Sequence, residues 1–154
     1  MSRAEKRLLS LGIRLPDLPA PKGSYLLFRR AGDLVFVSGQ SAFTADGTPL
    51  FPGRVGAEVT LEQGRRAAFE TGLRLLAILK EAAGDLDRVE IVKVTGYIAS
   101  AADFFQQTAV LNVLSDLFFD VLGERGRHSR AAIATGTLAF NCPVEAELVA
   151  RIVE

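Results

Sequence analysis

Residues 127–153 read RHSRAAIATGTLAFNCPVEAELVARIV, and this stretch decides the predicted fold. Two runs within it, Arg130–Leu138 and Val144–Val153, are predicted to be the last two strands, with a turn at Asn141-Cys142-Pro143. Alternate positions of the final run would share one apolar face: Val144, Ala146, Leu148, Ala150 and Ile152. The other face is mixed and carries Glu145, Glu147, Val149 and Arg151. A mixed face suits a subunit interface that contains polar sites better than a dry core.

Three further strands are expected upstream, at Tyr25–Arg30, Leu34–Gln40 and Val89–Ala99. The first two flank Ala31-Gly32-Asp33, and Gly-Asp between extended runs favours a hairpin. Residues 41–59 are rich in Gly, Pro and Thr, which predicts a loop.

Two helices are expected between the strands. The first begins at Thr60, because Gln63 stands three positions later as in a capping box, and Gly84 supplies its left-handed stop. The second is predicted to start after an Asp103 cap and to end at Gly123. Its apolar residues recur at helical spacing and form the expected buried stripe: Phe104, Leu111, Leu114, Phe118 and Val121.

Residues 1–22 are expected to be an N-terminal extension packed on a domain of residues 23–154. Ser2 would cap a short helix over residues 2–11, and prolines at 16, 19 and 21 exclude a helix beyond it. The order after this helix is β-β-α-β-α-β, an α+β arrangement. A mixed sheet with both helices on one face would leave its other face uncovered.

The amino-acid composition argues against several classes of function. The 154 residues include 18 Lys and Arg against 18 Asp and Glu, so the basic surplus typical of nucleic-acid binders is missing. One cysteine and one histidine exclude an intrachain disulfide and a Cys/His zinc cage, and no carboxylate cluster suggests another metal site. The first residues lack the apolar core of a signal peptide, and no run is long enough to cross a bilayer, so a cytoplasmic protein is expected.

Two charged residues of the final strands are candidates for chemistry. Arg130 opens one strand, and its planar guanidinium could hold a carboxylate through two parallel hydrogen bonds. Glu145 opens the next strand and could position or deprotonate a water if burial raised its pKa. An ordinary salt bridge for Arg130 and a solvated carboxylate for Glu145 are the alternatives. Glu147 points the same way as Glu145 and competes for the same role.

Weaker candidates lie elsewhere. In Val37–Gln40, Ser38 is followed by Gly39, which would allow close approach of a ligand or simply a bulge. Tyr25 could bind a ligand or only pack. His128 has no obvious Ser or Cys nucleophile partner in the sequence, and Cys142 has no activating base, so a catalytic triad is rejected.

Together these positions resemble the Rid/YjgF family, also called the reactive-intermediate deaminase or L-PSP family. The chain looks closest to its longer, chorismate-mutase-like branch. Arg130 and Glu145 match the family's Arg and Glu at the openings of the last two strands, and Ser38-Gly39-Gln40 its Ser-Gly-Gln strand end. Tyr25 matches the family's pocket tyrosine, and Asn112, followed by Phe118-Phe119, matches its Asn and Phe pair. Ala132 departs from the Cys often present in the deaminases.

The resemblance implies a homotrimer with three pockets between neighbouring subunits. It implies hydrolysis of a 2-imino acid or its enamine tautomer, such as 2-aminoacrylate, to a 2-keto acid and ammonia, with no cofactor or metal. Arg130 would hold the carboxylate, Glu145 would position water, and backbone groups near Gly39 and Ala132 would orient the imine. Tyr25, Ser38 and Asn112 would complete the binding site.

Other functions stay open. A non-catalytic binder or sensor of small carboxylate metabolites would need Arg130 but not Glu145. A chorismate-mutase-like rearrangement would need a second cation, which Arg125 or Arg127 could supply. An endoribonuclease activity is attached to the family by name, but the neutral net charge argues against nucleic acid as the main partner.

Overall fold

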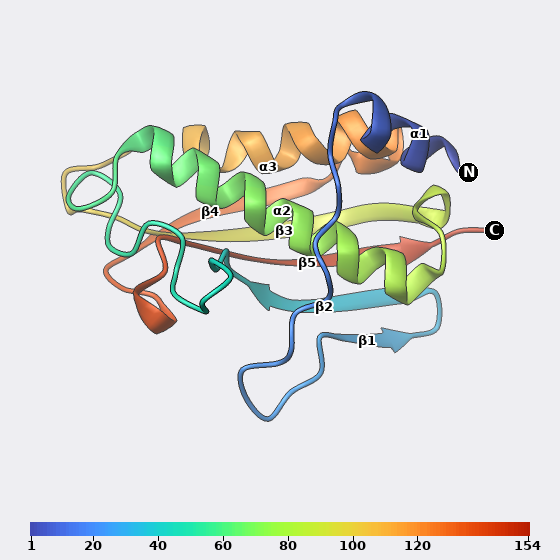
Figure 1. Cartoon of the computed structure of the whole chain (residues 1–154), viewed down its shortest axis with the longest axis horizontal. Coiled ribbons are helices and arrows are strands. Elements are labelled where there is room, and N and C mark those ends of the chain that lie inside the picture. Colours follow the sequence, from blue (N-terminus) through green and yellow to red (C-terminus); the bar gives the residue numbers. More distant parts are fainter.

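The computed structural model describes all 154 residues and contains one five-stranded sheet with two long helices on one of its faces (Figure 1). The strands are β1 (Phe28–Ala31), β2 (Leu34–Gln40), β3 (Val89–Ala99), β4 (Ser129–Thr135) and β5 (Val144–Ile152). Their spatial order is β1-β2-β5-β3-β4, in which only β3 and β4 are parallel. The predicted α+β fold with a mixed sheet is therefore confirmed.

The helices are α1 (Arg3–Ser10), α2 (Leu61–Ala83) and α3 (Gln107–Leu122), with short 3-10 turns η1 (Leu86–Arg88), η2 (Gly123–Gly126) and η3 (Ala139–Asn141). α2 packs on β2 and β5, and α3 packs on β3 and β4. Fully buried side chains such as Leu75, Leu76, Phe118 and Val94 fill the space between the two layers. Burying each of these stabilises the fold by roughly 1.5–3 kcal/mol before the entropy cost of ordering it.

The ends of α2 lie where the sequence predicts them. Thr60 and Gln63 form a complete capping box, in which the Gln63 N–H donates to Thr60 Oγ1 and the Thr60 N–H donates to Gln63 Oε1. Gly84 ends the helix with φ +76°, a conformation that costs glycine little.

Three predicted boundaries are wrong. α3 begins at Gln107 rather than after Asp103, because a turn in which the Phe104 N–H bonds Ala101 precedes it and the Gln107 side chain donates to the Phe104 carbonyl. β1 begins at Phe28 rather than Tyr25, since the segment before it folds back on itself, with the Tyr25 N–H donating to the Gly23 carbonyl. β4 ends at Thr135, three residues before Leu138.

The N-terminal segment is tied to the helices. The backbone N–H groups of Arg3 and Ala4 each donate to the Asp87 carboxylate at 2.8 Å, and Lys80 of α2 pairs with Glu5 at 2.9 Å. The chain then crosses α2 and reaches the far edge of the sheet, where β1 begins (Figure 1). None of the helices combines the length and apolar character needed to cross a membrane. The division into an extension and a domain at residue 22 stays a prediction.

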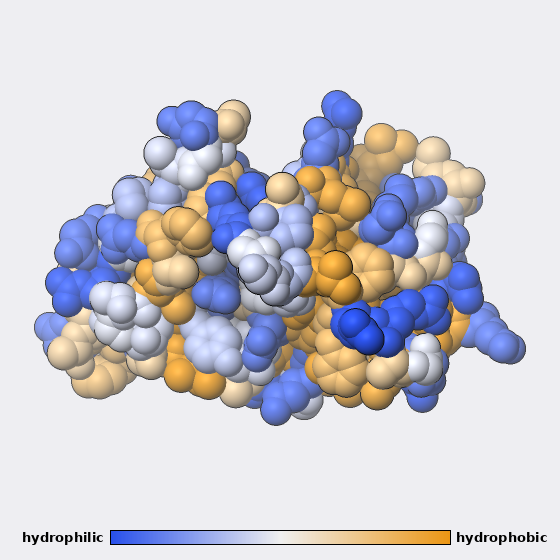
Figure 2. Space-filling view, turned by 90° about the horizontal axis from the view of Figure 1, so that it is seen from below, coloured by the Kyte–Doolittle hydropathy of each residue, from blue (hydrophilic) through white to orange (hydrophobic).

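The face of the sheet away from the helices is uncovered. Along β5 the burial alternates as predicted, with the apolar set buried and Glu145, Glu147, Val149 and Arg151 outward. Large apolar side chains are exposed on neighbouring strands, including Phe36 of β2 and Ile133 of β4. Figure 2 shows the molecule from the sheet edge where β1 lies. On that side, hydrophobic groups are gathered between hydrophilic ones.

Candidate functional site

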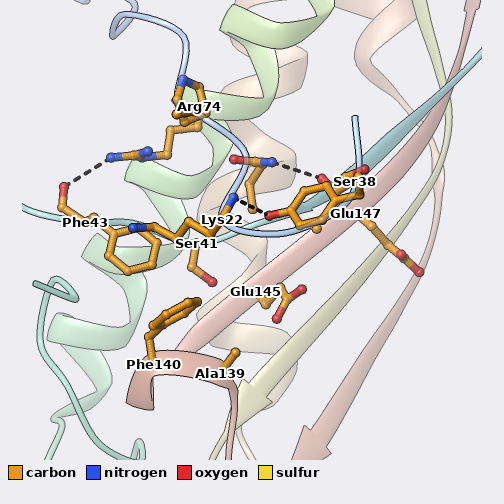
Figure 3. Close-up of a pocket in the computed structure, with 14 residues that line it drawn as sticks. Lys22, Ser38, Ser41, Phe43, Arg74, Ala139, Phe140, Glu145 and Glu147 are labelled. Carbon is orange, nitrogen blue, oxygen red and sulfur yellow. Dashed lines mark hydrogen bonds between the residues drawn. The ribbon is translucent and has the colours of Figure 1, made fainter. Parts of the chain in front are cut away.

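A cavity of about 420 Å³ lies where β2 ends and β5 begins, and we call it the Glu145 pocket (Figure 3). Its floor comes from the two strands, and its walls come from the N-terminal segment, the 41–43 loop, α2 and η3. The lining residues are Pro19, Ala20, Lys22, Tyr25, Ser38, Gly39, Gln40, Ser41, Phe43, Arg74, Ala139, Phe140, Glu145 and Glu147. The structure thus brings together four predicted site residues: Tyr25, Ser38, Gly39 and Glu145.

The Glu145 side chain lies directly over the backbone of Gly39. A Cβ placed on Gly39 would collide with Glu145 Oε1 and stand 3.1 Å from its Cδ. Glycine in the Ser38-Gly39-Gln40 strand end is therefore needed for the carboxylate to reach its position. The pairing of β2 with β5 shifts register between Val37 and Gln40, which agrees with the bulge predicted as the alternative for Gly39. The group that approaches Gly39 is a side chain of the same protein, and approach of a ligand stays a prediction.

Glu145 is poised as a weak base. Burial, and next the negative charge of Glu147, raise the pKa of the Glu145 carboxyl above its usual value of 4.5. Glu145 accepts no hydrogen bond from any group of the chain, so its oxygens are free for a water or a ligand. Glu147 is less available, because the Tyr97 hydroxyl donates to its Oε1 at 3.3 Å.

Ser38 and Tyr25 are held by local hydrogen bonds. The Ser38 hydroxyl donates to the Leu26 carbonyl at 2.6 Å, and the Lys22 N–H donates to the Tyr25 hydroxyl at 3.2 Å. These bonds fix the two side chains at the mouth of the pocket. The Tyr25 hydroxyl keeps its own proton available to donate.

A second cavity of about 410 Å³ surrounds the guanidinium of Arg130, and we call it the Arg130 pocket. Arg130 Nη2 donates to Asn112 Oδ1 at 2.9 Å, and Nη1 donates to Ser115 Oγ at 3.0 Å. Both partners lie on α3. Arg130 forms no ion pair within the chain, so its remaining donors are free for an anionic ligand. Two residues that the resemblance places in the site, Arg130 and Asn112, are therefore in contact.

His128 does have a serine partner, contrary to the interpretation of the sequence. His128 Nδ1 lies 2.6 Å from the Gly126 carbonyl, which can only accept, so Nδ1 carries the proton. The Ser115 hydroxyl, 2.9 Å from Nε2, then donates to this nitrogen while it accepts from Arg130. His128 and Ser115 therefore fix the orientation of the guanidinium. Ser115 and His128 are 13 residues apart and lie in different elements, so no local sequence pattern predicted their contact.

The two pockets lie on opposite faces of the sheet. Arg130 is paired in register with Val94, which is buried under the helices, whereas Glu145 is paired with Tyr97 on the uncovered face. One chain consequently does not bring Arg130 and Glu145 into the same site. Ala132, opposite Gly96, packs against the core and lines neither pocket.

The other arginines considered as second cations are already engaged. Arg125 donates to the Asp87 carbonyl. Arg127 lies over the Phe119 ring at 4.4 Å and pairs with Glu124 at 3.1 Å. Arg127 still lines the Arg130 pocket. No cluster of three or more His, Cys, Asp or Glu side chains is arranged to hold a metal ion.

The family model described as "YjgF/chorismate_mutase-like, putative endoribonuclease" matches residues 5–152. The chain belongs to this family. The match includes both pockets and nearly all of the N-terminal segment.

Solved members of the YjgF family differ in how closely they follow this chain. The Agrobacterium tumefaciens protein Atu1372, of unknown function, is 37% identical, with 97% of this chain and 92% of that chain covered and a TM-score of 0.86. A Shewanella oneidensis protein that bears the same endoribonuclease description is 30% identical, with 98% and 100% covered and a TM-score of 0.92. RidA from a Psychrobacter species is 26% identical, with 88% and 94% covered and a TM-score of 0.63. In both sequence and structure, this YjgF-family chain is therefore more similar to Atu1372 than to RidA.

Several residues that line the Glu145 pocket could not be predicted from the sequence. Lys22 and Phe43 lie outside the helices and strands, and Phe140 lies in the short turn η3. Arg74 is a polar interruption in the apolar LRLLAIL run of α2. That interruption was the one available signal, because a charged residue within a buried helical stripe usually has a partner or a ligand.

Proposed function

We propose that this YjgF-family protein hydrolyses 2-imino acids, or their enamine tautomers, to 2-keto acids and ammonia. The working site would form in a homotrimer, where the Arg130 pocket of one subunit closes on the Glu145 pocket of its neighbour. Deaminases are known within the Rid family, and this proposal assigns that reaction to the Atu1372-like branch.

The observation that carries the proposal is the complementarity of the two pockets. Arg130 is a fixed cation that forms no ion pair, although the charge of Asp116 acts on it from the same pocket. Glu145 is a half-buried carboxylate that forms no ion pair either. Leaving each charge partly desolvated and unpaired is costly in a lone chain. Bringing the two pockets together around a small acid would offset both costs.

The uncovered sheet face supplies a surface for such an assembly. Phe36 and Ile133 are exposed there beside polar groups, as in interfaces with an apolar centre and a polar rim. The trimer itself is what the family resemblance implies.

The reaction needs only modest catalysis by the protein, because an imine is already electrophilic. Arg130 would hold the substrate carboxylate by charge-assisted hydrogen bonds, with the imine carbon above Glu145. Glu145 would accept a proton from water as the oxygen bonds to the imine carbon, and the imine nitrogen would gain a proton. The resulting carbinolamine would then release ammonia as its C–N bond breaks and the C=O bond forms. Orientation and modest proton transfer suffice for this reaction.

Replacing Arg130 tests the proposal. We expect Arg130→Ala to lower the conversion of freshly generated 2-aminoacrylate to pyruvate by roughly a hundredfold or more, because the carboxylate loses its charged partner. Arg127→Ala is the matched control, since Arg127 lines the same cavity but is paired with Glu124, and it should retain most activity. An unchanged rate in Arg130→Ala would remove this residue from the mechanism.

Replacing Glu145 separates an enzyme from a binding protein. With Glu145→Gln we expect unchanged affinity for a 2-keto acid, measured by calorimetry, and loss of turnover. Wild-type protein that binds 2-keto acids but does not accelerate imine hydrolysis would be a metabolite binder. Light scattering should show a trimer, and a monomer at assay concentration that is still active would contradict the shared site. The neutral net charge gives no support to RNA cleavage.

A further inference from the structure

Two cations of the Glu145 pocket have no carboxylate partner and no place in the mechanism above. Lys22 forms no ion pair, and its ammonium lies over the Phe43 ring at 4.2 Å from the centroid and 5.3 Å from that of Phe140. Arg74 donates a single hydrogen bond, to the Phe43 carbonyl at 3.2 Å. Most donors of both groups are therefore unused.

The nearby carboxylates do not neutralise these cations. Glu70, whose charge acts on Arg74, is paired with Arg66 at 3.1 Å. Glu145 and Glu147 line the pocket but accept no hydrogen bond from Lys22 or Arg74. Arg74 is half-buried, and burial lowers the pKa of its guanidinium, so its charge is held there at a cost.

Two aromatic rings shape this end of the pocket. Phe43 and Phe140 meet edge to face with centroids 5.9 Å apart, and Lys22 and Arg74 reach over Phe43 on the other side of the cavity from Glu145 (Figure 3). Phe140 has φ +59°, which is uncommon for a bulky residue, and Asn141 has φ +62°. Such strained backbone is most often kept where it places a functional side chain.

We propose that Lys22 and Arg74 form a subsite for a second carboxylate, so that the preferred substrates are 2-imino acids with an acidic side chain. This inference rests on the proposed function and names its substrate class. The first carboxylate would bind the neighbour's Arg130, the imine carbon would lie near Glu145, and the methylene groups would pack against the contacting rings of Phe43 and Phe140. Lys22 would give the N-terminal segment a direct part in selecting the substrate.

Two product analogues of equal chain length test the subsite. 2-Oxoglutarate and 2-oxopentanoate both have five carbons and differ at the far end, where one has a carboxylate and the other a methyl group. In calorimetric titrations of the wild-type protein we expect 2-oxoglutarate to bind about tenfold more tightly, because charge-assisted hydrogen bonds form only with the second carboxylate.

Substitutions locate the preference. Lys22→Met and Arg74→Gln should each weaken 2-oxoglutarate binding several-fold and leave 2-oxopentanoate binding unchanged. Arg65→Gln is the control, since Arg65 is on the same helix but pairs with Glu62 at 3.6 Å outside the pocket. Lys22 lies on an exposed segment, so Lys22→Met should leave the fold intact even if Arg74→Gln does not.

The outcomes separate this inference from the proposed function. Equal affinity for the two acids, or a preference that survives both substitutions, overturns the subsite. If the subsite fails in this way but imine hydrolysis still depends on Arg130 and Glu145, the proposed function stands without the subsite. If neither acid binds and no imine is hydrolysed, the proposed function fails and the subsite fails with it.

Discussion

Gly39 is the residue on which the position of Glu145 depends. Any side chain there must displace the Glu145 carboxylate, which is the flexible end of the contact. We expect Gly39→Ala to fold with a loss of about 1 kcal/mol or less, since Glu145 can swing away, but to lose most imine hydrolysis. Thermal melts and the 2-aminoacrylate assay measure the two effects.

Gly136→Ala is the matched control for this substitution, because no atom lies within 4 Å of a Cβ placed at Gly136. It should keep its activity. Full activity in Gly39→Ala would show that Glu145 does not need its observed position.

His128 should make stability depend on pH. Burial, the largest influence, lowers the pKa of His128 below its usual 6.5, and the charge of Arg130 acts in the same direction, against the raising effect of the Gly126 carbonyl. The unfolded chain therefore takes up a proton at this side chain at higher pH than the folded chain does. The contribution of His128 is retained above pH 6.5 and lost as the pH falls below it.

Urea unfolding from about pH 7.5 to about pH 5.5 checks this dependence. Because the chain has one histidine, His128→Gln should flatten the fall in the free energy of unfolding over this range. Acidic pH should also raise the KM, since a protonated Nε2 can no longer accept from Ser115, which orients Arg130. Parallel curves for the two proteins would exclude His128 as the titrating group.

Single residues could be predicted from the sequence only where a local pattern marked them. Arg130 and Glu145 stood at strand openings, and Gly39 ended a strand, so these positions were recognisable. Ser115 and Lys22 were not, because their contacts with His128 and Phe43 join segments whose approach depends on tertiary packing.

At the scale of elements, the N-terminal helix α1 depends on Asp87. This carboxylate accepts the N–H groups of Arg3 and Ala4, as an N-cap side chain would. We expect Asp87→Ala to destabilise the fold by about 1–2 kcal/mol and to release α1 from η1. Hydrogen exchange of residues 3–10 and urea unfolding measure these changes.

Asp120→Ala provides the comparison, since Asp120 is an exposed carboxylate on α3 without a hydrogen bond in the chain. Asp87→Ala should also weaken the 2-oxoglutarate preference if the N-terminal segment carries Lys22 into place. Unchanged exchange in Asp87→Ala would show that the apolar contacts of Ala4 and Leu8 hold the helix alone.

The elements with strong end signals were predicted well. β2, β3 and the capping box of α2 lie where the patterns place them. The start of α3 could not be predicted, because its N-cap Gln106 makes no side-chain capping bond and Asp103 offered a better local signal. The end of β4 depends on its parallel partner β3, because the last pair between the two strands is Ala99 with Thr135. The sequence of β4 alone does not predict where its partner strand ends.

At the scale of the whole molecule, helices cover one face of the sheet and leave the other face exposed to solvent. In a single chain, Phe36 and Ile133 are exposed to solvent on the uncovered face. The Glu145 pocket and the Arg130 pocket are also separate there, so neither contains both proposed catalytic groups. The sequence predicted this face from the alternation in β5. It could not show which surfaces meet, since that depends on a second copy of the chain.

The placement of Arg130 and Glu145 on opposite faces of the sheet has a genetic consequence. Protein carrying Arg130→Ala and protein carrying Glu145→Gln should each be inactive alone, yet co-expression should restore activity, because some mixed trimers pair an intact arginine with an intact glutamate. With random mixing in equal amounts, about a quarter of the sites would be whole. Complementation between two dead alleles would thus reveal a centre shared across chains, and a silent mixture would place both residues in separate tasks.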